Sequence, residues 1–135
     1  MEDKMNLDQL CAEYGHKFAE EVSRADGFNA KKAEVLITKA LGVLQEQGLY
    51  AFVLFCESRP SGERAGAERI KENTQKLLKE LQLISNGDFL DELRKDDGLL
   101  TRLDDLMLAI QVLEKSLIYA RFHAKAMKEY QGEQQ

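Results

Sequence analysis

The chain has 135 residues, of which 44% are hydrophobic and 32% are charged, and its formal net charge is −5 at pH 7. This length and composition predict one globular domain whose core needs no disulfide or metal to hold it. The net charge argues against nonspecific nucleic-acid binding driven by bulk positive charge.

Membrane spans and secretion signals are not expected. The longest apolar run extends from Leu49 to Cys56, far short of the ~20 residues that a membrane-spanning helix needs. The segment MEDKMNLDQ contains no apolar stretch typical of a signal peptide. Cys11 and Cys56 have no partner at metal-ligand spacing and lie in apolar-periodic segments, which predicts buried thiols. These features predict a soluble, cytoplasmic protein.

Apolar periodicity and a single proline favour an all-α fold, a compact bundle of about five to six helices in one domain over residues 1–135. The expected helical segments are 7–24, 30–47, 49–58, 63–84, 88–95 and a long one from about 99 or 101 to 131. Asn29 is placed to cap the second segment, and Gly48 to end it. Residues 132–135 are expected to fray.

The last segment is the longest. Thr101 and Asp104 fit a capping box at its start. About 30 residues of helix would span ~45 Å, more than a compact bundle of this mass requires, so one end is expected to project.

One face of this last helix changes character along its length. Its expected core stripe is formed by Leu103, Met107, Ile110 and Leu117. The same face continues to Arg121, Lys125 and Lys128. Two interpretations stand: a core face that becomes solvated where the helix outgrows the bundle, or a basic patch that follows a phosphate backbone.

The second half of the chain is electrically polarised. Residues 86–105 hold seven acids: Asp88, Asp91, Glu92, Asp96, Asp97, Asp104 and Asp105. Residues 115–128 hold four bases and no acid. Lys32 and Lys39, on one flank of the second helix, form a second and weaker basic pair. These lysines and the three bases of the last helix are the candidate RNA-binding or subunit-contact residues.

The sequence offers no catalytic constellation. Nucleophilic catalysis needs a serine or cysteine beside a base, and the only histidines are His16 and His123. A phosphate-binding glycine loop is absent. Glu13 and His16 give one Glu-x-x-His half of a di-metal motif, but His16 lies opposite the apolar stripe and Ala120, not a glutamate, precedes His123 at that spacing. No metal site and no cofactor are therefore expected.

Histidine phosphotransfer is an alternative. Such domains are small acidic bundles with one exposed histidine, which describes His16 in outline. The sequence around it, His-Lys-Phe-Ala-Glu, lacks the usual His-x-x-Lys-Gly.

Two segments carry a resemblance to a known family. GVLQEQGLYAFVLFCESR (42–59), with its Gly48-Leu49 and Ala51-Phe52 pairs, resembles the middle signature of the small helical subunit (Cmr-type) of type III CRISPR RNA-guided effector complexes. LEKSLIYARFHAKAMKE (113–129) resembles the aromatic and basic closing helix of that family. The order of helices and the total length also agree.

The resemblance implies a non-catalytic subunit for antiviral defence. Its expected partners are other subunits of the complex, copies of itself, and the guide RNA and target RNA, whose duplex it would support through backbone contacts. Copies would stack head to tail as a minor filament, with the acidic 88–105 segment of one copy against the basic 121–128 segment of the next. A generic helical scaffold or adaptor is the other alternative.

Overall fold

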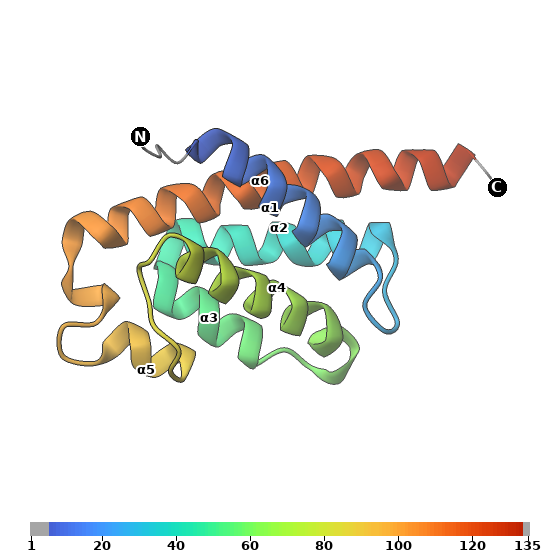
Figure 1. Ribbon diagram of the computed structural model, residues 1–135. Helices are drawn as coiled ribbons and strands as arrows, with labels where there is room; N and C mark the ends of the chain where they lie inside the picture. Colours follow the sequence, from blue (N-terminus) through green and yellow to red (C-terminus); the bar gives the residue numbers. More distant parts are fainter. Residues whose placement is uncertain (1–5, 134–135) are drawn as a thin grey trace.

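Six α-helices and one 3₁₀ turn make up the described part of the chain (Figure 1). In the computed structural model, the backbone is described for residues 6–133 and the side chains for residues 6–128. In chain order the elements are α1 (Leu7–Ser23), α2 (Ala30–Gln47), α3 (Leu49–Glu57), α4 (Ser61–Glu80), α5 (Phe89–Arg94), the 3₁₀ turn η1 (Leu99–Thr101) and α6 (Leu103–Glu133). Residues 6–133 contain no strand, which confirms the predicted all-α bundle with a long last helix.

Helix α6 organises the bundle. It packs along α1 and α2, whereas α4 packs against α1 and α3. Helix α5 and η1 lie at the end of the molecule where α6 begins, and the last turns of α6 run past α1 and α2 at the opposite end (Figure 1). With 31 residues, α6 covers about 46 Å and connects the two ends of the molecule.

The core lies between these helices. Phe18 of α1 and Phe52 of α3 are both fully buried, and burial of a large apolar side chain contributes about 1.5–3 kcal/mol. The predicted burial of both thiols is confirmed, with Cys11 2% and Cys56 4% exposed. Within residues 6–133, no helix combines the length and the apolar character that a bilayer crossing demands.

Local signals fix most helix ends as predicted. The Asn29 side chain accepts a hydrogen bond from the Lys32 amide and caps α2, and Gly48 ends that helix with a φ of 94°. The predicted end of α4 at residue 84 is wrong, because the chain leaves the helix after Glu80. Gln82 has a φ of 61°, and the amide of Leu83 donates to the carbonyl of Leu78. This Schellman motif turns Leu83 back into the core.

The start of α6 also differs from the prediction. Leu99 to Thr101 form η1, and Arg102 is extended before α6 begins at Leu103. The hydroxyl of Thr101 donates to the carbonyl of Gly98, 2.7 Å away, so it stabilises the 3₁₀ turn and does not form the predicted capping box with Asp104. At the other end, the helical backbone continues to Glu133; the predicted frayed residues 134 and 135 lie outside the described part.

The predicted core stripe of α6 is wrong at its beginning. Leu103 is 68% exposed and Met107 is 51% exposed, whereas Leu117 is fully buried. The buried face consists of small and apolar residues, namely Ala109, Val112, Leu113, Ser116, Leu117, Ala120 and Ala124. The beginning of the predicted face, at Leu103 and Met107, is therefore solvent-facing, whereas Ile110 and Leu117 farther along it pack in the core.

A glycine permits the close packing of α1 on α6. A Cβ atom at Gly15 would lie 2.5 Å from the Cβ of Tyr119 and 3.1 Å from the carbonyl oxygen of Ser116. Only a residue without a side chain fits there. The two helices are thus held in close contact around Gly15 and Tyr119.

Candidate nucleic-acid interface

Three predicted bases gather where α6 passes α2. The Nζ atom of Lys128 donates to Oε1 of Glu34 at 2.7 Å and forms a salt bridge across the two helices. This hydrogen bond lowers the pKa of the Glu34 carboxyl, and the charges of Lys125 and Arg121 lower it further. All three bases therefore lie around Glu34. We call Arg121, Lys125, Lys128 and their neighbour Glu34 the α2–α6 basic cluster.

The members of the α2–α6 basic cluster differ in availability. Lys128 is committed to Glu34 and only partly exposed, whereas Arg121 and Lys125 are exposed. Neither Arg121 nor Lys125 forms a salt bridge with any of residues 6–128. These two side chains can therefore reach a phosphate without breaking a salt bridge to that part of the chain.

The second predicted pair, Lys32 and Lys39, lies on the other flank of α2, beside α4. Lys32 Nζ donates to the carbonyl oxygens of Gly27 at 3.1 Å and Gly62 at 3.2 Å. Lys39 Nζ pairs with Glu63 at 3.0 Å. Both ammonium groups therefore join α2 to α4, and the structure does not bring them together with the α2–α6 basic cluster.

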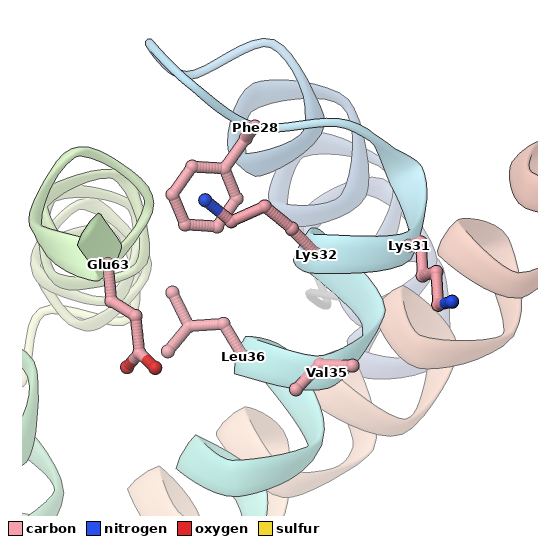
Figure 2. Close-up of a pocket in the computed structure, with 6 residues that line it drawn as sticks. All are labelled: Phe28, Lys31, Lys32, Val35, Leu36 and Glu63. Carbon is pink, nitrogen blue, oxygen red and sulfur yellow. The ribbon is translucent and has the colours of Figure 1, made fainter.

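A basic residue that the sequence analysis missed is Lys31. It is exposed on α2 one turn before Glu34, and Figure 2 shows its side chain pointing away from Lys32 and Glu63. The adjacent Lys32 indicated a basic start of this helix. Spacing alone, however, did not show that the side chains of Lys31 and Lys32 point in different directions. Lys31 extends the exposed positive charge along α2.

A small hollow opens between α2 and the start of α4 (Figure 2). It has a volume of about 180 Å³ and is lined by Phe28, Lys31, Lys32, Val35, Leu36 and Glu63. The Lys32 ammonium lies 4.6 Å from the centre of the Phe28 ring, and Gly66 has no room for a Cβ because that ring packs on it. The hollow is smaller than the ~300 Å³ at which small-molecule sites begin, so we assign it no ligand.

The acidic segment lies at the opposite end of the molecule, around α5 and η1 (Figure 1). Part of its charge is neutralised locally. Arg94 pairs with Asp91, Lys95 with Glu92 at 3.0 Å, and Arg102 with Asp105 at 3.1 Å. Asp88 caps α5. The exposed carboxylates that form no salt bridge within residues 6–128 are Asp88, Asp96, Asp97 and Asp104.

Both thiols are buried, whereas His16 lies on the surface. Burial raises the pKa of the Cys56 thiol to about 12 and also raises the pKa of the Cys11 thiol, so both stay protonated and unreactive at neutral pH. His16 is exposed, as predicted, with 62% of its side chain accessible. Its nearest carboxylate is Glu20, whose Oε2 lies 3.9 Å from Nε2 of His16.

Comparison of the chain with protein-family models, curated proteins and solved structures gives no match.

Proposed function

We propose that this chain is a non-catalytic small subunit of a type III CRISPR (Cmr-type) RNA-guided effector complex, which stacks with copies of itself and supports the guide–target duplex through phosphate contacts. The resemblance of residues 42–59 and 113–129 suggests the family. The observation that best supports the proposal is the uneven distribution of charge. The exposed bases Arg121 and Lys125 lie toward one end of α6, and exposed acids such as Asp96 and Asp104 lie at the other.

The α2–α6 basic cluster supports the RNA contact. Arg121, Lys125 and Lys31 are exposed on two adjacent helices, and the Glu34 carboxylate lies near Arg121 and Lys125. Ammonium and guanidinium groups that follow a backbone give affinity without reading sequence. Phe122 is 65% exposed beside Arg121 and offers a face on which an unpaired base can stack.

The RNA contact can be tested by charge reversal. Arg121→Glu with Lys125→Glu should weaken binding to a guide–target RNA duplex, and the slope of log affinity against log salt should become shallower by about 2. The matched control is Arg69→Glu with Lys76→Glu, two exposed bases on α4. Both variants are four units more negative than the parent chain, whose net charge is −5. Equal binding by the two variants, measured by fluorescence anisotropy, would refute the RNA contact.

The alternatives make different predictions. A generic helical adaptor would bind no RNA duplex at physiological salt, and the control and test variants would behave alike. A phosphotransfer domain would take up phosphate at His16, whose exposure is the observation that favours it. Incubation with a phosphodonor, followed by mass spectrometry of the parent and His16→Gln chains, distinguishes phosphotransfer from the proposed role as an RNA-binding subunit.

A further inference from the structure

The two histidines of the chain meet on the surface where α1 packs on α6. His16 and His123 are 107 positions apart, yet their ring centroids are 5.6 Å apart at an interplanar angle of 83°. Both residues are exposed. They border an open hollow of about 650 Å³, whose other lining residues are Gln9, Ala12, Glu13 and Lys17.

The helices that carry the two rings are packed closely against each other. The close approach at Gly15, next to His16, fixes α1 against α6. Nearby, the Tyr119 hydroxyl donates to Asp8 at 2.8 Å, and Lys115 pairs with the same carboxylate at 2.8 Å. The imidazoles are therefore presented by two packed helices and not by loops, as a preorganised binding site requires.

The separation of the rings suits two ligands of one metal ion. A zinc–nitrogen bond of about 2.0–2.1 Å places the ion about 3.2 Å from each ring centroid. Two rings at tetrahedral or slightly wider angles are then about 5.2–5.6 Å apart. The observed 5.6 Å lies within that range. An edge contact between two solvent-exposed imidazoles, by comparison, contributes little to folding.

We propose that His16 and His123 form a site for a divalent transition-metal ion such as Zn²⁺ or Ni²⁺, with water in the remaining positions. Residues 6–128 offer no cluster of three histidine, cysteine or carboxylate ligands, so the protein supplies two. Glu20 lies beside His16 and adds negative charge near the ion, although it also pairs with Arg24 at 2.7 Å. Imidazole favours Zn²⁺, Ni²⁺ and Cu²⁺ over Mg²⁺ and Ca²⁺.

Calorimetric titration of the tag-free chain with ZnCl₂ and with NiCl₂ tests the site. We expect one ion per chain, an increase in melting temperature on binding, and no competition from MgCl₂. His16→Gln and His123→Gln should each weaken binding at least tenfold and abolish the increase. Gln9→Ala, in the same hollow, should keep both effects.

Three outcomes would overturn the proposal. Two ions per chain, with each histidine variant losing one ion at unchanged affinity, would mean independent surface imidazoles. Binding that survives both variants would place the ion elsewhere, for example on the thiols. No binding at millimolar metal would mean that the two imidazole rings are in contact but do not coordinate a metal ion. None of these results depends on Arg121 or Lys125, so the metal-binding and RNA-binding proposals are tested independently.

Discussion

The contact between α1 and α6 at Gly15 gives the sharpest stability prediction. Alanine is a better helix former than glycine by about 1 kcal/mol, so Gly15→Ala would stabilise an isolated helix. In the bundle, the new Cβ would lie 2.5 Å from Tyr119 Cβ and 3.1 Å from the Ser116 carbonyl oxygen. Neither atom belongs to the flexible end of a side chain, so α1 must move away from α6. Overpacking of this kind costs about 1–3 kcal/mol.

Gly42→Ala is the matched control, because Gly42 is also in the interior of a helix and a Cβ there meets nothing within 4 Å. That variant should gain about 0.5–1 kcal/mol. Both variants replace a helical glycine with alanine, so the gain in helix propensity cancels when they are compared. Gly15→Ala should therefore be about 1–3 kcal/mol less stable than Gly42→Ala. Urea unfolding followed by far-ultraviolet circular dichroism measures the difference. Equal stability of the two variants would refute the close packing.

Three further predictions use the same unfolding assay. Gln82→Gly should raise the free energy of unfolding by about 0.5–1 kcal/mol, because Gln82 holds a φ of 61° that glycine adopts without strain. Tyr14→Phe should lower it by about 1 kcal/mol, since the buried hydroxyl donates to Glu80 at 2.8 Å. Lys128→Gln should destabilise the chain at neutral pH and have no effect in acid. The reason is that the folded state lowers the pKa of Glu34, so this stabilisation is present above the unfolded-state pKa and is lost as the pH falls through the folded-state value.

Helices and their ends were predictable where the signal is local. Asn29 caps α2 through its own side chain, and Gly48 adopts a φ of 94° that disfavours other residues. The early end of α4 was not predictable in this way. It depends on a strained Gln82 and on the burial of Leu83, and the apolar pattern of residues 81–84 resembles one more helical turn.

The buried face of α6 was misassigned because its tightest contacts involve small residues. Ala109, Ala120 and Ala124 are fully buried, and they allow neighbouring helices to approach closely. A pattern weighted by hydrophobicity favours Leu103 and Met107, which lie near the beginning of α6 and remain more than half exposed.

The candidate sites depend on contacts between distant segments, so spacing could not assign them. Lys32 and Lys39 share a flank of α2 as predicted, but only the structure places the Gly62 carbonyl and Glu63 beside them. Lys128 likewise meets Glu34 from 94 positions away. The pairing of His16 with His123 has the same origin.

The charge polarity of the molecule sets a limit on its proposed assembly. If Arg121 and Lys125 bind the acidic end of the next copy, they are not free for RNA phosphates, so one surface cannot serve both roles at once. A chain that carries Asp96→Lys, Asp104→Lys, Arg121→Glu and Lys125→Glu together distinguishes the roles, and its net charge equals that of the parent chain. It should regain the head-to-tail association that the Arg121→Glu, Lys125→Glu variant loses, measured by light scattering, because opposite charges meet again. RNA binding by the reversed surface should stay weak. Recovery of RNA binding together with assembly would instead mean that the stacked array creates the RNA site and that these two side chains serve only the contact between copies.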